Sequence, residues 1–191
     1  MNEYRTVRTG KVFSGEITEK KSRFIAALKK AESVEEASAF ILSERKKYYD
    51  AKHHCSAYII AGENGGIDTM HSSDDGEPSG TAGKPMLDII KGAGLKNVVL
   101  VITRYFGGTL LGTGGLVRAY SSAAKEAVEN AEITLVRELL HCSLNFDYAS
   151  EPKLRRFLRE SETLMGDAYY SEKVRFDIYI SESDEDEYRI K

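Results

Sequence analysis

A nearly unbroken apolar run, followed at once by a glycine-rich segment, constrains the fold of this chain more than any other feature. Residues 97–103 read Asn-Val-Val-Leu-Val-Ile-Thr, and a short run so rich in β-branched residues is typical of a strand buried on both faces. Five glycines then fall within nine residues, and from Leu116 onward apolar residues recur at helical spacing. The sequence therefore predicts a central strand, a glycine loop and a helix that ends near residue 131.

The glycine loop has the chemistry of an anion site. Glycine lets another group approach the backbone closely, and the N–H groups at a helix N-terminus point toward a bound anion. Cationic side chains lie in and near this segment, and guanidinium groups match the geometry of phosphate. We therefore predict that an anion or a nucleic acid is bound by Lys84, Arg104, Gly107, Gly108, Gly112, Gly114, Gly115 and Arg118.

A purely structural role for the same residues stays open. In that interpretation the glycines only permit tight packing of loop against loop. Arg104 then pairs with Asp74 or Glu77 in a sealed internal network, because a buried charge needs a partner of opposite sign.

The second unusual stretch, residues 72–85, is punctuated by glycine and proline throughout and predicts an irregular loop. Its carboxylates could hold a divalent cation, or they could bond backbone N–H groups and shape the loop. It is not a phosphate-binding P-loop, because Pro78 replaces the first glycine and Pro85 stands where a Ser or Thr is needed. We predict no resident metal or cofactor, and we single out a loop or acidic site made of His54, Asp74, Asp75 and Glu77.

The rest of the first part predicts a hairpin, a helix and a further strand. Residues 12–17 and 22–28 read as the two arms of the hairpin, with Lys20 and Lys21 near its tip. Such charges either protect a sheet edge from aggregation or make a binding contact. Ser33 and Glu36 have capping-box spacing for a helix over 34–48, and residues 53–60 alternate as a strand does.

The last part predicts a separate α+β unit. A strand over 138–147, a helix over 150–159 and a hairpin over 169–180 give the order β-α-β-β of a ferredoxin-like domain. A second helix is expected in the acidic run at 183–187, and because no closing strand follows it, we expect this domain to be incomplete. The fold class is α+β, with domains at 1–134 and 135–191.

Charge and composition limit the partners. The net charge is −3, with +1 on residues 1–135 (18 Lys and Arg, 17 Asp and Glu) and −4 on residues 136–191 (9 against 13), so nucleic-acid contact requires a local patch. No apolar run approaches the ~20 residues that span a bilayer, and the N-terminus lacks a signal sequence, so we expect a cytoplasmic protein without membrane contact. Cys55 and Cys142 are expected to be free thiols.

Five blocks of the sequence closely resemble the IMPACT family, whose bacterial members include YigZ and YvyE. They are residues 21–25, 50–58, 74–85, 103–108 and 111–120, so the resemblance covers essentially all of the first domain. It implies an N-terminal α/β sandwich like the second domain of a small-subunit ribosomal protein, and a ferredoxin-like C-terminal domain like the last domain of elongation factor G. Eukaryotic relatives are linked to translational control through a stress kinase, and they carry a different protein-binding domain.

Two functional hypotheses follow. In the first, a non-enzymatic regulator of translation binds RNA, the ribosome or a translation factor through the glycine loop. In the second, an enzyme acts on a phosphorylated small molecule or nucleotide, with the acidic loop holding Mg²⁺ or transferring protons and His53 or His54 as a proton shuttle. We favour the first and assign no catalytic residue, because the sequence shows no nucleophile constellation. The oligomeric state is not determined by the sequence.

Overall fold

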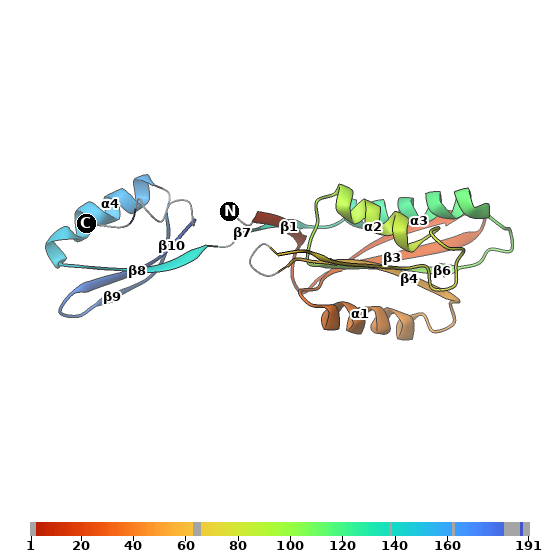
Figure 1. Ribbon diagram of the computed structural model, residues 1–191, viewed down its shortest axis with the longest axis horizontal. Coiled ribbons are helices and arrows are strands. Elements are labelled where there is room, and N and C mark those ends of the chain that lie inside the picture. The colour runs from red at the N-terminus through yellow and green to blue at the C-terminus, as the bar shows by residue number, and fades with distance from the viewer. Residues whose placement is uncertain (1–2, 63–65, 138, 162, 182–187, 189–191) are drawn as a thin grey trace. The chain divides into compact units, whose positions relative to one another are not determined.

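The computed structural model describes residues 3–62, 66–137, 139–161, 163–181 and 188 (Figure 1). The chain divides into two compact units, Tyr4–Val136 and Arg137–Lys191, and Glu3 belongs to the second. In the part of the chain that is described, no helix is long and apolar enough to cross a membrane.

The first unit is built on a five-stranded antiparallel sheet. Its strands lie side by side in the order β2 (Val12–Glu19), β3 (Ser22–Lys30), β6 (Val98–Tyr105), β4 (His53–Ile60) and β5 (Thr69–Ser73). The predicted central strand is thus observed as β6. Its side chains are buried up to Arg104, which explains why the run is apolar on both faces.

Helices cover both faces of this sheet (Figure 1). α1 (Val34–Lys47) packs on one face, and α2 (Gly83–Gly92) and α3 (Gly112–Glu129) pack on the other. Alternate residues of β6 serve two cores, because successive side chains of a strand point to opposite faces. Val98, Leu100 and Ile102 join the core with α2 and α3, whereas Val99 and Val101 join the core with α1.

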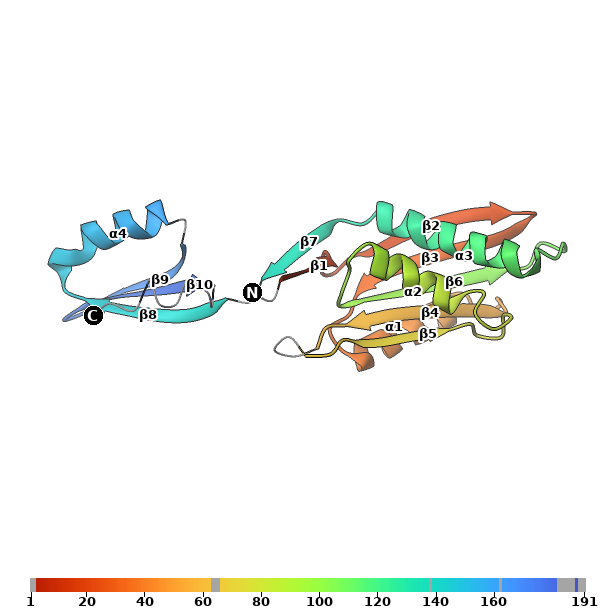
Figure 2. The same ribbon diagram turned by 45° about the horizontal axis from the view of Figure 1, so that its top comes forward.

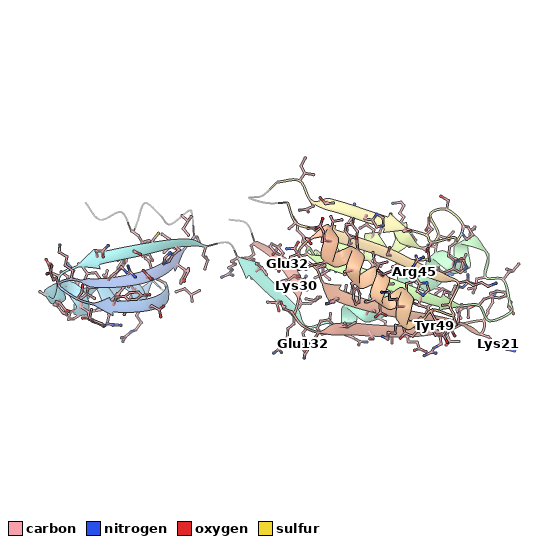
Figure 3. All side chains as sticks on the ribbon, turned by 90° about the horizontal axis from the view of Figure 1, so that it is seen from below. Lys21, Lys30, Glu32, Arg45, Tyr49 and Glu132 are labelled. Atoms are coloured by element: carbon pink, nitrogen blue, oxygen red, sulfur yellow. The ribbon has the colours of Figure 1, made fainter. Side chains whose placement is uncertain are left out.

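The hairpin predicted in the first part is observed, and its turn has an unusual backbone. Lys20 and Lys21 connect β2 to β3 with φ angles of 45° and 66°. A two-residue hairpin turn with positive φ at both positions normally takes Asn-Gly or Gly-Gly, because other residues are strained there. Here two lysines hold that strained conformation. Figure 3 shows Lys21 at one end of the first unit.

The edge strand β5 was not predicted. The sequence predicts an irregular loop over residues 72–85, yet Thr69–Ser73 pairs with β4. The five residues are mostly polar, so they lack an apolar alternation. Cross-strand stacking of His71 on Tyr58, with centroids 4.8 Å apart, helps to hold them in the sheet. A separate two-stranded sheet joins β1 (Glu3–Val7) to β7 (Ile133–Arg137).

The second unit has the predicted order β-α-β-β. Its elements are β8 (Leu140–Phe146), a 3₁₀ turn (Tyr148–Ser150), α4 (Glu151–Glu160), β9 (Leu164–Tyr170) and β10 (Val174–Ile180). The antiparallel sheet order is β8-β10-β9, and Figure 2 shows α4 lying over one of its faces. The helix expected at 183–187 lies outside the described residues.

Candidate functional site

Arg104 stands near the end of the central strand, and its guanidinium pairs with Glu77 inside the protein. Nη1 donates to Oε1 at 2.7 Å and to Oε2 at 3.0 Å, with the two side chains only 7% and 3% exposed. The Tyr120 hydroxyl donates to the same Oε1 at 2.7 Å. The purely structural interpretation of the sequence allowed this ion pair, in which Glu77 balances the positive charge of Arg104.

A thiol extends this buried network. Cys55 Sγ lies 3.0 Å from the carbonyl oxygen of Asp74 and 3.3 Å from the Tyr120 hydroxyl, and its single S–H can donate to either oxygen. Burial raises the pKa of Cys55 to about 12, and burial together with the neighbouring Cys55 also raises the pKa of Tyr120. The thiol is therefore protonated at neutral pH and is not a nucleophile in this conformation. Cys55 and Cys142 are both free, as the sequence predicted.

The Asp74 carboxylate caps the N-terminus of α2. It accepts hydrogen bonds from the backbone N–H groups of Gly80, Ala82 and Gly83 at 2.8–2.9 Å. An internal carboxylate thus occupies the position where an external anion would bind this helix. Lys84, in the first turn, is 71% exposed and pairs with Asp88 one turn later at 3.3 Å.

The free energy of unfolding should change with pH in the acid range because the Asp74 carboxylate caps α2. Burial raises the pKa of this carboxyl, but the three backbone hydrogen bonds together outweigh burial and leave the pKa below its ordinary value. A lowered folded pKa adds stability above the unfolded pKa of ~3.9, and this stability is lost as the pH falls through the folded value.

We therefore expect Asp74→Asn to lower the free energy of unfolding at pH 7 by about 1 kcal/mol, because the amide carries no negative charge at the N-terminus of α2. The gap should close below about pH 4. Denaturant titrations of both proteins from pH 7 to pH 2.5 measure it. A gap independent of pH would contradict the assignment of the charge to this cap.

Asp75 and the two histidines form a second set of loop contacts. The Asp75 carboxylate accepts from Arg45 Nη2 and from the backbone N–H of His54, both at 2.7 Å. The ring Nδ1 of His53 lies 2.9 Å from the Asp75 carbonyl oxygen, and the ring Nε2 of His54 lies 3.1 Å from the carbonyl oxygen of Tyr48. Arg45 is a contact that the sequence did not predict, because its partner lies 30 residues away.

The four residues of the predicted loop or acidic site thus lie close together, but they serve different contacts. Glu77 pairs with Arg104, Asp74 caps α2, and Asp75 binds the backbone of His54. Among the described residues, no group of three or more His, Cys, Asp and Glu side chains is placed to hold a metal ion.

Most glycines of the loop are explained by a close approach of neighbouring atoms or by a positive φ angle. A Cβ on Gly107 would lie 2.0 Å from the backbone carbon of Lys21, and the N–H of Gly107 donates to Ser22 Oγ at 3.1 Å. Gly108 and Gly112 have φ angles of 87° and 72°, which favour glycine. A Cβ on Gly115 would meet Leu111 Cβ at 3.0 Å, whereas Gly114 has room for one.

The N-terminus of α3 differs from those of the other helices in this unit. Ser33 caps α1 and Asp74 caps α2, but Leu111 supplies no side-chain cap for α3, and no acidic residue lies in its first turn. Arg118 is exposed on the second turn, with Nη1 close to Gly114. Of the two arginines that flank the loop, Arg118 is therefore the one whose charge faces outward.

Further exposed residues surround this helix end. Phe106 is 54% exposed and Leu110 is 82% exposed. The strained turn of Lys20 and Lys21 packs its backbone against Gly107, so two more cations lie beside the loop. We call this the glycine-loop surface and define it as Lys20, Lys21, Phe106, Leu110, Arg118 and the backbone N–H groups of residues 112–114. The sequence placed the lysines at a hairpin tip but did not predict that the tip contacts the loop.

These observations define a two-domain protein with a three-layer α/β unit and a β-α-β-β unit. The model of the Impact N-terminal domain matches residues 20–128, and that of a domain of unknown function, DUF1949, matches residues 144–191. The IMPACT family member YvyE of Bacillus subtilis is 44% identical over 172 residues, which are 88% of this chain and 76% of YvyE. The chain belongs to the IMPACT family.

Solved structures resemble the fold as well. A crystal structure described as that of an hypothetical protein is 32% identical, with a TM-score of 0.69 over 98% of this chain and 89% of its own. A structure described as the two-domain translational regulator Yih1 is 29% identical over 66% of this chain and 49% of its own. Its TM-score is 0.45.

Proposed function

We propose that this protein is a non-enzymatic regulator of translation that binds RNA or the translation machinery through the glycine-loop surface. Membership of the IMPACT family supports the link to translation, since the resemblance implies that role for the eukaryotic relatives. The observation that carries the binding site is the uncapped N-terminus of α3, beside the outward-facing Arg118 and a strained turn made of two lysines.

The chemistry of this surface suits a phosphate backbone with accessible bases. Free N–H groups at a helix N-terminus and cationic side chains bind phosphate oxygens. The ring of Phe106 is half exposed and could stack on a base, and it lies 5.6 Å from the Arg104 guanidinium carbon. Holding Lys20 and Lys21 in a strained turn costs free energy, and such strain is concentrated at functional sites.

Binding explains these residues better than the enzymatic hypothesis does. An enzyme would need Asp74, Asp75 or Glu77 free to hold Mg²⁺ or to transfer a proton. All three are engaged in hydrogen bonds within the fold, and the only thiol beside them is buried and protonated. By contrast, the cations of the glycine-loop surface point away from the protein.

The test is filter binding of the full chain to ribosomes, tRNA and single-stranded RNA across a salt series. For a single strand, each phosphate contact contributes about −0.7 to the slope of log K against log salt. We expect Lys21→Ala and Arg118→Ala each to weaken binding and to flatten this slope by about that amount. The matched control is Lys125→Ala, which removes an exposed cation of the same helix that pairs with Glu129.

The proposal makes a specific claim about location as well as charge. If Lys125→Ala weakens binding as much as Arg118→Ala, the attraction is a general effect of charge and the surface is not a site. If the wild type binds none of the three RNA preparations at low salt, the nucleic-acid proposal is wrong.

A further inference from the structure

Within the described residues of the second unit, the three-stranded sheet has α4 packed on one face and no element packed on the other. Leu158, Phe176 and Ile178 belong to the core under α4. Because side chains alternate along a strand, the residues between them on β10 face the other way. The pairing register places β8 and β9 residues beside them, so this open sheet face carries His141, Ser143, Tyr169, Arg175, Asp177 and Tyr179.

Two aromatic clusters lie on the open sheet face. The Arg175 guanidinium carbon is 4.1 Å from the ring centroid of Tyr169, and the rings of His141 and Tyr179 are 5.3 Å apart and tilted by 34°. Tyr169 is 45% exposed and Tyr179 is 39% exposed. Both clusters join register partners on neighbouring strands and so help to hold the sheet together. Flat rings and guanidinium planes are also the groups on which unpaired bases stack.

The carboxylate at the centre of this face is compensated. Asp177 is only 9% exposed, and it accepts a hydrogen bond from Ser143 Oγ at 2.8 Å. Arg175 Nε and His141 Nε2 each lie 3.6 Å from the same oxygen. The charge of Asp177 is thus compensated, whereas the exposed carboxylate of Asp167 lies beside one ring and accepts from the Tyr169 hydroxyl at 3.4 Å.

The acidic character of this part of the chain lies elsewhere in the sequence. Residues 136–181 carry seven Lys and Arg against eight Asp and Glu, a net charge of −1. Residues 182–191 carry two against five, a net charge of −3. The sheet unit itself is thus nearly neutral, and stacking rather than bulk charge must supply the affinity.

We infer that the open sheet face binds single-stranded nucleic acid, with bases stacked on Tyr169 and Tyr179. Tyr179 and Arg175, the register partner of Tyr169, are four residues apart along β10, a distance of ~13 Å. The face thus offers two stacking positions that one strand can reach. These residues are separate from the glycine-loop surface, so this inference and the proposed function can fail independently.

The experiment uses the full chain and a fluorescein-labelled 12-nucleotide oligouridylate, with binding followed by anisotropy. We expect the double variant Tyr169→Ala, Tyr179→Ala to lose affinity by about tenfold or more, because each stacked base contributes substantially. The double Tyr→Phe variant keeps both rings and should bind as the wild type does. The control is Tyr170→Ala, which removes the neighbouring ring on the α4 side, where its hydroxyl contacts Arg155.

Unchanged thermal melts should accompany these changes, since both tyrosines are exposed. Ultraviolet crosslinks from the oligouridylate should map by mass spectrometry to peptides of β9 or β10. The inference is overturned if the double alanine variant binds as tightly as the wild type, or if only Lys21→Ala and Arg118→Ala reduce the affinity. It is equally overturned if the double alanine variant changes the sedimentation of the protein and leaves RNA binding intact, because the face would then join two protein chains.

Discussion

Replacing Glu77 with alanine should lower the free energy of unfolding by about 3–5 kcal/mol, the cost of leaving a buried charge without its partner. The variant removes both hydrogen bonds of Arg104 Nη1 and the acceptor of the Tyr120 hydroxyl. The Arg104 side chain is 7% exposed, so water cannot easily replace the carboxylate. Urea denaturation followed by circular dichroism measures the change.

A surface ion pair of the same sheet provides the matched control. Glu16 on β2 binds Arg23 on β3, but these side chains are 44% and 52% exposed. Glu16→Ala should therefore change the stability by little more than the error of measurement. The hydrophobic double variant Arg104→Met, Glu77→Leu should recover much of the loss, because it removes both charges together.

Arg104→Lys separates the structural role of the guanidinium from a role in binding. Lysine has a shorter side chain than the one whose Nη1 reaches Glu77, and it lacks the planar guanidinium that lies over the Phe24 ring, so the fold should be destabilised. An unchanged melting curve together with lost RNA binding would instead show that Arg104 acts directly on a ligand. That result would contradict the assignment of Arg104 to the fold.

The second large effect is expected at Gly107. Gly107→Ala places a Cβ 2.0 Å from a backbone carbon of Lys21, a contact that no side-chain rotation can relieve. Overpacking of this kind costs about 1–3 kcal/mol, and backbone against backbone belongs at the upper end of that range. The turn must move away from the loop, so we also expect the RNA affinity assigned to the glycine-loop surface to fall.

Gly114→Ala is the control for this prediction. Gly114 lies in the first turns of α3, and the only atom near a new Cβ is Nη1 of the flexible Arg118, at 3.6 Å. Alanine is favoured over glycine in a helix by up to about 1 kcal/mol, so the variant should be as stable as the wild type or slightly more stable. Equal losses for Gly107→Ala and Gly114→Ala would show that the close approach does not matter. Thermal melts of the two variants decide between these outcomes.

Together these contacts divide the charged residues into those that face inward and those that face outward. Charges that face inward, on Arg104, Glu77 and Asp74, are matched within the protein. Charges that face outward, on Lys21 and Arg118, lie beside an uncapped helix end. The site in the proposed function therefore uses only one of the two arginines of the anion site predicted from the sequence, because Arg104 already has an internal partner.

Local pattern determined most of the secondary structure. The central strand, the capped helix after Ser33, the hairpin with a lysine tip and the β-α-β-β order of the second unit were all predicted and are all observed. Each of these depends on residues close together in the sequence, such as an apolar period or a capping residue three positions from its acceptor. The five blocks that resemble the IMPACT family also sufficed to indicate the family to which the chain belongs.

Tertiary structure decided which distant residues the polar side chains of the site contact. The sequence allowed Arg104 to face an anion, Asp74 or Glu77, and the fold brings it to Glu77, 27 residues away. Lys21 and Gly107 lie far apart in the sequence, and β5 forms only because β4 offers a paired edge. Hydrogen bonds and ion pairs between distant segments leave no period in the sequence, because either partner could serve several neighbours until packing of the cores fixes which one it meets.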